Sequence, residues 1–231
     1  MSSFSKRPYV RRLIIAAFIA GTLCIAGIAS AASRNVLWEI VSGCLDPTIP
    51  NYCTLCRWPL ATSPCGADKR CEKTSELWAE TADYAAIRDI KMCNCPEGFV
   101  HGLVLPRTRV TGVEDPHRPD GIWNFAWTVA ARRIHDPSHI CLVVNPSGMR
   151  TQDQLHVHIM RLQSDARQKL EKCSGVHITD LDTVWETAGK LAADNGLRDY
   201  GVIVIQTSGG GYWVHIEKES PEREYGVISC R

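Results

Sequence analysis

The chain of 231 residues lacks a strong net charge, and it has no acidic residue before Glu39. Its 26 basic and 25 acidic residues leave a formal net charge of +1. Five of the basic residues fall within residues 1–38, so 21 basic residues stand against 25 acidic ones in the remainder, a balance of about −4. A mildly acidic body lacks the basic face that a nucleic-acid backbone requires, so we expect no nucleic acid as a partner.

Long apolar runs are also missing, with one exception near the start. Residues 13–32 (LIIAAFIAGTLCIAGIASAA) carry no charge and follow a basic segment within residues 1–12. A signal-peptide core has ~7–15 apolar residues, whereas a membrane-spanning helix needs ~20. The run therefore predicts a transmembrane signal-anchor at 13–32, with residues 1–12 cytoplasmic and residues 33–231 exported. A cleaved signal peptide stays open as the alternative, because Ala29-Ser30-Ala31 resembles a cleavage site.

Cysteine, by contrast, is abundant. Ten of the eleven cysteines lie beyond the apolar run, and five of these concentrate in a loop-like, Cys-rich insertion near residues 44–75. An even, high cysteine count in an exported domain predicts a disulfide framework. The spacing Cys53-x-x-Cys56 leaves a structural zinc site as the alternative.

Apolar periodicity in the body predicts a mixture of helices and strands. Helices are expected over residues 34–44, 121–135 and 163–196, the last broken near Ser174-Gly175 and resuming with Thr179 as its cap. Strands are expected over residues 83–90, 99–106, 139–146, 154–162, 200–207 and 212–219. Glycines 209–211 join the last two strands as a hairpin. This order predicts an α+β fold, an antiparallel sheet with helices packed on one face.

The segment 154-QLHVHI-159 alternates strictly between polar and apolar residues. Side chains two apart on a strand point the same way, so Gln154, His156 and His158 are expected to form one polar row. The apolar residues between them are then expected to face a core. A neutral imidazole is nucleophilic near pH 7 without an activating base, so the row favours attack on phosphorus.

The loop before this row, 145-NPSGMRTQDQ-154, is rich in groups that bind anions. Free backbone N–H groups in a turn make an anion cradle, and a guanidinium fork suits phosphate oxygens. The loop's expected substrate contacts are Asn145, Ser147, Arg150, Thr151 and Gln152.

The row resembles the His-φ-His-φ-His-φ motif of the histidine-triad (HIT) superfamily, with Gln154 in the first place. Residues 86–90 (AIRDI) and 100–107 (VHGLVLPR) are similar to upstream pieces of the same pattern. Within the superfamily, residues 103–116 (LVLPRTRVTGVEDP), 124–132 (NFAWTVAAR) and 150–159 (RTQDQLHVHI) are similar to the CDP-diacylglycerol pyrophosphatase family. The likeness covers residues 34–162 well and the last third only loosely.

The resemblance implies a HIT-like fold and a role for each matching residue. His156 would attack the CMP phosphorus of CDP-diacylglycerol and expel phosphatidate, while His158 would hydrogen-bond the phosphate. Asp89 would contact the ribose hydroxyls and Asn145 the phosphate. Gln154, in place of a histidine, and Arg107, at the basic position of the upstream pattern, complete the expected substrate-binding residues.

The resemblance also implies a location and a set of partners. The family is anchored in the bacterial inner membrane, which implies a periplasmic catalytic domain at 33–231 that meets its lipid substrate in the membrane plane. The aromatic helix with Trp123, Phe125 and Trp127 is expected either to face lipid or to pack in a core. No cofactor is expected. Residues 107–109 (RTR) lack the histidine of zinc-bearing relatives, which favours disulfides over a structural zinc at Cys53-x-x-Cys56. A homodimer is expected by analogy with the superfamily.

Two other functions stay open. His-x-His on a strand is also typical of a zinc-dependent periplasmic hydrolase, for which His101 or His215 would be the third ligand. A disulfide-stapled domain that binds a nucleotide without catalysis is the other.

Overall fold

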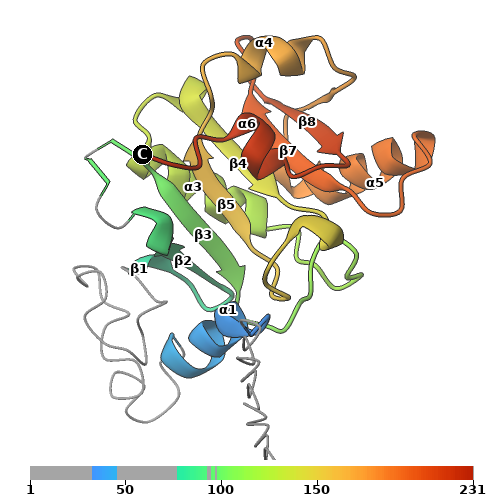
Figure 1. The fold of residues 1–231 in the computed structure, drawn as a ribbon. Coiled ribbons are helices and arrows are strands. Elements are labelled where there is room, and N and C mark those ends of the chain that lie inside the picture. The colour runs from blue at the N-terminus through green and yellow to red at the C-terminus, as the bar shows by residue number, and fades with distance from the viewer. Residues whose placement is uncertain (1–32, 46–76, 93–94, 97, 231) are drawn as a thin grey trace, which may run out of the picture. The chain divides into compact units, whose positions relative to one another are not determined.

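The core of the fold is an eight-stranded antiparallel sheet (Figure 1). The computed structural model describes residues 33–45, 77–92, 95–96 and 98–230. The strand order in space is β1-β2-β3-β5-β4-β7-β8-β6. The strands are β1 (Leu77–Glu80), β2 (Tyr84–Arg88), β3 (His101–Pro106), β4 (Ile140–Val144), β5 (Val157–Arg161), β6 (Val176–Ile178), β7 (Gly201–Gln206) and β8 (Tyr212–Glu217).

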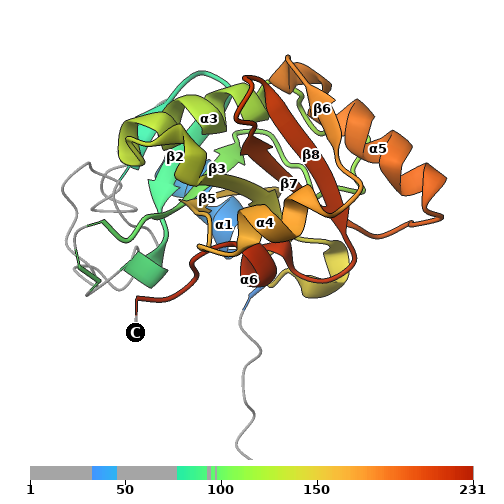
Figure 2. The same cartoon turned by 90° about the horizontal axis from the view of Figure 1, so that it is seen from above.

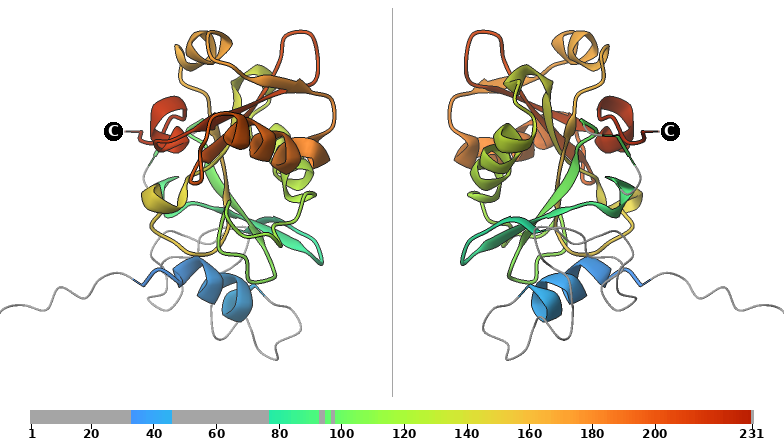
Figure 3. Two further views of the ribbon diagram at one scale, coloured as in Figure 1. Left: turned by 90° about the vertical axis from the view of Figure 1, so that its right-hand side faces the viewer. Right: turned by 90° about the vertical axis from the view of Figure 1, so that its left-hand side faces the viewer.

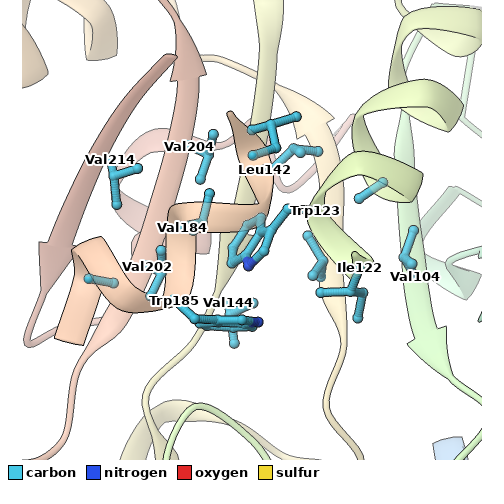
Figure 4. Packing of buried hydrophobic residues seen from close by; sticks show 14 of the residues in the cluster. Val104, Ile122, Trp123, Leu142, Val144, Val184, Trp185, Val202, Val204 and Val214 are labelled. Atoms are coloured by element: carbon cyan, nitrogen blue, oxygen red, sulfur yellow. The ribbon is translucent and has the colours of Figure 1, made fainter. Parts of the chain in front are cut away.

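One face of the sheet is covered by two helices, α3 (Ile122–Arg133) and α5 (Val184–Asp194) (Figure 2). Between them lies the largest apolar cluster, in which Trp123 of α3 meets Trp185 of α5 edge to face with ring centroids 4.8 Å apart (Figure 4). Trp123 is fully buried. The alternative in which this tryptophan faces lipid is therefore wrong, and core packing is confirmed.

The opposite face is also covered, so the prediction of helices on one face only is wrong. Edge-on views place α6 (Pro221–Tyr225) on the side opposite α3 and α5 (Figure 3). The helix α4 (Ala166–Glu171) contributes to an apolar cluster on this second face. A further cluster includes α1 (Val36–Glu39) and the π-helix that continues it, η1 (Ile40–Cys44). The central strand β4 explains why both faces are covered, because all five of its residues are buried and apolar. A strand with apolar side chains on both faces of the sheet requires packed elements on both faces.

Most predicted elements are confirmed with shifted ends. The hairpin of β7 and β8 turns through Gly210 and Gly211, whose φ values are +89° and +77°. The last predicted helix begins at Val184 and not at Thr179, because residues 176–178 form β6 and the Asp180 side chain caps a short 3₁₀ turn (η5, Leu181–Thr183). The short elements β1, β6 and α6 were not predicted.

The cysteine framework is confirmed at one bridge and wrong at two positions. Cys95 and Cys230 form a disulfide across 135 residues of sequence. Cys141 and Cys173 are free. Cys141 is a small apolar core residue of β4, and burial raises the pKa of its thiol to about 12. Cys53 and Cys56 lie outside the described residues.

The predicted anchor at 13–32 also lies outside the described residues. Within the part of the chain that the structure describes, no helix has the length and apolar character needed to cross a bilayer.

Candidate active site

The histidine row lies at the centre of the sheet's second face. In the register of the sheet, His158 of β5 lies opposite Leu103 of β3 on one side and Val143 of β4 on the other. Leu103 belongs to the apolar cluster of α1, and Val143 belongs to the cluster of α4 and α6. The histidines therefore form a polar strip between two apolar clusters. The apolar residues that alternate with this row, Leu155, Val157 and Ile159, face the core of α3 and α5, as predicted.

His156 has one ring nitrogen committed and one available for chemistry. It precedes β5, and its Nδ1 lies 2.7 Å from the backbone carbonyl of Gln154. A carbonyl only accepts, so Nδ1 carries the proton and the neutral ring has its lone pair on Nε2. Burial lowers the pKa of His156, which favours this neutral form. The residue as a whole retains 8% of its surface exposed.

His158 is held between two other imidazoles. Its Nδ1 lies 3.1 Å from Nε2 of His101 on β3. Its ring meets that of His156 edge to face, with ring centroids 4.8 Å apart. The Nε2 of His101 also faces Glu222 at 3.6 Å and Asp89 at 3.8 Å. Two facing carboxylates favour a proton on that nitrogen, so His101 donates to Nδ1 of His158. Neutral His158 then presents an N–H at Nε2.

Asn145 and Glu222 complete this side of the site. Nδ2 of Asn145 donates to Glu222 at 2.7 Å and lies 3.5 Å from Nε2 of His158. Its Oδ1 accepts from the Ser220 hydroxyl at 2.8 Å. Glu222 is buried on α6 and forms an ion pair with Lys91. Burial opposes its ionisation, but the neighbouring histidines and Lys91 prevail and hold its pKa well below the usual range.

Asp89 lies at the edge of the same strip. The residue is buried, and its Oδ1 accepts from the backbone N–H of Lys91 at 2.8 Å. Its N–H in turn donates to the carbonyl of His101. The structure thus brings together four of the predicted site residues, Asp89, Asn145, His156 and His158.

Gln154 has a different environment from the one expected. Its side chain is fully buried, and Nε2 donates to the carbonyls of Pro106 and Thr108 at 3.0 and 2.8 Å. Its Oε1 accepts from Val110 at 3.5 Å. The amide therefore ties the loop after β3 to the start of β5, and its role in substrate binding stays a prediction, without support from its position.

The anion cradle of the preceding loop exists, but a side chain of the protein occupies it. The backbone N–H groups of Ser147 and Gly148 and the Ser147 hydroxyl all donate to the carboxylate of Asp199. The guanidinium of Arg150 makes two hydrogen bonds to Glu114. Sequence periodicity gives no signal for these partners, because Asp199 and Glu114 are distant in the chain.

The other three predicted contacts lie toward α1 or the surface. Arg107 donates to the carbonyls of Leu45 and Thr81 and pairs with Glu80. Gln152 bonds the backbone of residues 33 and 37, and Thr151 is exposed. Their binding roles stay predictions, without support from their position.

Two charged residues of the site were not predicted. Lys91 stands two residues after Asp89, and this closeness in sequence to a predicted site residue is the signal that could have found it. Glu222 stands in 220-SPEREY-225, where a serine followed by proline is a signal for the start of a helix. The helix has only five residues, which is too few for apolar periodicity to support that signal.

The same cluster could hold a metal ion. Single donor atoms of Asp89, His101 and His158 lie within 4.8 Å of one another. The mixed nitrogen and oxygen set suits zinc. In the structure the two imidazoles are hydrogen-bonded to each other, so a metal would have to displace that bond.

Comparison with known proteins agrees with the motif resemblance. The family model described as CDP-diacylglycerol pyrophosphatase matches residues 32–209. A protein named probable CDP-diacylglycerol pyrophosphatase from Mycobacterium leprae is 35% identical over 142 residues, which are 56% of this chain and 44% of that protein. CDP-diacylglycerol pyrophosphatase from Mycobacterium bovis is 37% identical over 67 residues, 25% of this chain and 26% of that protein.

In these matches the chain spans less than half the length of the curated relatives. The family model nevertheless extends over most of the chain, from residue 32 to the turn after β7, and includes the whole histidine row. The chain belongs to the CDP-diacylglycerol pyrophosphatase family.

Proposed function

We propose that this protein hydrolyses the diphosphate of CDP-diacylglycerol, giving CMP and phosphatidate, with His156 as the nucleophile. The single observation that carries the proposal is the bond from Nδ1 of His156 to the carbonyl of Gln154. That bond fixes the tautomer with a lone pair on Nε2, next to donors that suit a phosphate.

The reaction proceeds in two steps. Nε2 of His156 attacks the phosphorus of the CMP moiety, and the bond from this phosphorus to the bridging oxygen breaks. Phosphatidate leaves with that oxygen and the electron pair. Water then attacks the phosphorus of the nucleotidyl-histidine, the phosphorus–nitrogen bond breaks, and a proton of the water passes to solvent as CMP is released. His156 returns to its neutral form with Nδ1 still protonated.

The neighbouring groups have the chemistry to stabilise charge on the phosphate oxygens. Nε2 of His158 and the amide nitrogen of Asn145 lie 3.5 Å apart. The amide nitrogen donates, and Nε2 of His158 donates in the tautomer that His101 and Glu222 favour, so both can donate to phosphate oxygens. The ammonium group of Lys91 adds a positive charge at the same end of the strip. We infer that Asp89 faces the ribose, as in the HIT superfamily, and that the domain adopts a HIT-like arrangement.

The location belongs to the same proposal. An uncharged run of 20 residues at 13–32 behind a basic segment supports a single anchor in the bacterial inner membrane, with the catalytic domain in the periplasm. An anchored domain would meet a membrane lipid with a nucleotide head by diffusion in the membrane plane.

The test is the substitution His156→Ala in the full chain, assayed with CDP-diacylglycerol in detergent micelles. We expect no measurable release of CMP, with the circular dichroism spectrum unchanged. The wild-type protein, quenched at neutral pH during turnover, should carry the mass of one cytidylyl group on His156. CMP release by the variant at the wild-type rate would disprove the proposal, and retained nucleotide affinity without turnover in the wild type would favour the binding-only domain.

A zinc-dependent hydrolase is the second candidate, favoured by the proximity of Asp89, His101 and His158. Dialysis against a chelator separates the two. Turnover that persists after chelation supports nucleophilic catalysis by His156, whereas turnover that is lost and then restored by Zn²⁺ supports the metal.

A further inference from the structure

We infer that Glu222 is a positioning residue of the active site, which acts by clamping the amide of Asn145 in one orientation beside His158. The inference rests on the proposed function, since it assigns to Asn145 and His158 the phosphate contacts of the reaction. Glu222 stands on α6, beyond the residues matched by the family model.

Glu222 contacts the Asn145 amide through two of its groups, the side-chain carboxylate and the backbone N–H. The Glu222 carboxylate accepts from Nδ2 of Asn145 at 2.7 Å, while the backbone N–H of Glu222 lies 3.4 Å from Oδ1 of the same amide. The Ser220 hydroxyl adds a third bond, to Oδ1 at 2.8 Å. An amide can present either its oxygen or its nitrogen to a neighbour, and these three contacts select one of the two orientations. The nitrogen faces the Nε2 side of His158, so the pair offers donors and no acceptor to a phosphate.

The Glu222 carboxylate also faces the histidines directly. Its two oxygens lie 3.6 Å from Nε2 of His158 and 3.6 Å from Nε2 of His101. A carboxylate beside an imidazole holds the ring in one tautomer, as the aspartate of a Ser-His-Asp triad does. Here it favours a proton on each of those nitrogens, which is the arrangement that leaves His158 a donor.

The charge of Glu222 is balanced on the side away from Asn145. Lys91, half exposed, forms the ion pair with this buried carboxylate. A buried ionised carboxylate costs free energy unless it is paired and hydrogen-bonded. A fold that keeps one beside His101 and His158 points to a role in the site. With the pair formed, the carboxylate adds little net negative charge to a pocket that must accept a diphosphate.

A covalent link holds α6 in place over the site. Cys230 follows Glu222 by eight residues and is bonded to Cys95, which follows Lys91 by four. Both members of the ion pair are thus close in sequence to the two ends of one disulfide. The backbone bond from Val227 to Arg161 at 2.8 Å joins the same segment to β5.

The experiment is a double-mutant cycle on the full chain with CDP-diacylglycerol micelles. For Glu222→Gln we expect kcat to fall about 10- to 100-fold, as for other residues that orient a catalytic imidazole, with KM changed less than about 3-fold. Because Glu222 acts in part through Asn145, Glu222→Gln should slow the Asn145→Ala variant by a smaller factor than it slows the wild type. Glu224→Gln, an exposed glutamate of the same helix, is the matched control and should keep the wild-type kcat.

A readout independent of turnover accompanies the cycle. The side-chain amide resonances of Asn145 in a ¹H–¹⁵N spectrum should shift in Glu222→Gln and stay in place in Glu224→Gln. Wild-type kcat in Glu222→Gln, or losses that add fully in the double variant, would overturn the inference. The proposed function is tested separately, because turnover by His156→Ala would disprove it. If His156→Ala is inactive and Glu222→Gln is fully active, only the inference about Glu222 is rejected.

Discussion

At the scale of single residues, the polar row divides into two different kinds of side chain. The rings of His156 and His158 meet edge to face, and Nε2 of His158 lies 3.5 Å from Nδ2 of Asn145. Gln154 instead satisfies backbone groups of the loop after β3. Alternation places all three side chains on one side of the segment. Only their hydrogen-bond partners show which of them are available for catalysis and which one stabilises the backbone.

The role of Gln154 can be tested through stability. Gln154→Ala leaves the buried carbonyl of Pro106 without its donor, at a cost of about 1–3 kcal/mol for an unsatisfied buried group. Gln154→Glu should destabilise further, because a buried carboxylate would face two carbonyl oxygens. Urea unfolding followed by circular dichroism measures both.

Gln168→Ala is the control for this comparison, since Gln168 is exposed on α4. Its free energy of unfolding should lie within about 0.5 kcal/mol of the wild type. Equal stability of Gln154→Ala and the wild type would show that the buried amide is not the link between the loop and β5.

At the scale of elements, the shortest ones decide where the site is. The helix α6 has five residues, yet it carries Glu222 and packs where the second face needs cover. The residue that follows α6, Gly226, is closely packed. A Cβ on Gly226 would lie 1.8 Å from the sulfur of Met160 and 2.9 Å from the carbonyl oxygen of Glu222. The backbone of Gly226 also bridges to Leu162, just after β5. Close approach of backbone to β5 thus requires glycine there.

Gly226→Ala should therefore displace α6. We expect a loss of about 1–3 kcal/mol in the free energy of unfolding from overpacking against a buried methionine. Turnover should fall as well, since Glu222 moves with the helix. Thermal unfolding and the CMP-release assay measure the two effects.

Gly209→Ala serves as the comparison, because nothing lies within 4 Å of the position of its added Cβ. This variant should keep both stability and turnover. A Gly226→Ala protein that behaves like Gly209→Ala would contradict the close packing of α6 on β5.

At the scale of the whole molecule, the site joins regions that are far apart in the chain. Asp89 and Lys91 follow β2, and Asn145 follows β4. His101 belongs to β3, His158 belongs to β5, and His156 directly precedes β5. Glu222 belongs to α6. The disulfide between Cys95 and Cys230 closes this arrangement across 135 residues. A bridge that closes a long loop restricts the unfolded chain more than a short one does.

The double variant Cys95→Ser/Cys230→Ser should lower the free energy of unfolding by about 2–4 kcal/mol, the typical contribution of a native disulfide. It should also reduce turnover, because α6 loses its tether beside Lys91. Cys173→Ser, at an exposed free cysteine, should change neither quantity. Unchanged turnover in the double variant would mean that packing alone holds α6 over the site.

The elements that the sequence predicted well share one property, a period carried over enough residues to be recognised. The segments of α3, β3, β7 and β8 each carry an apolar pattern over six or more residues, and their type was predicted correctly. In contrast, β1, β6 and α6 have three to five residues, which is too few for a period to be distinguished from chance. Burial of both sheet faces was missed because continuous apolar strands do not say what covers them.

For the site, the sequence by itself determined the reactive groups: two histidines in one row, and Asp89 and Asn145 through their motif context. The tertiary structure alone decided which polar groups are left for a substrate. Asp199 occupies the turn's N–H groups, Glu114 pairs with Arg150, and Glu222 reaches Asn145 from the other end of the domain. The physical reason is that a motif records local spacing, whereas the pairing of charges depends on which distant segments the sheet brings together.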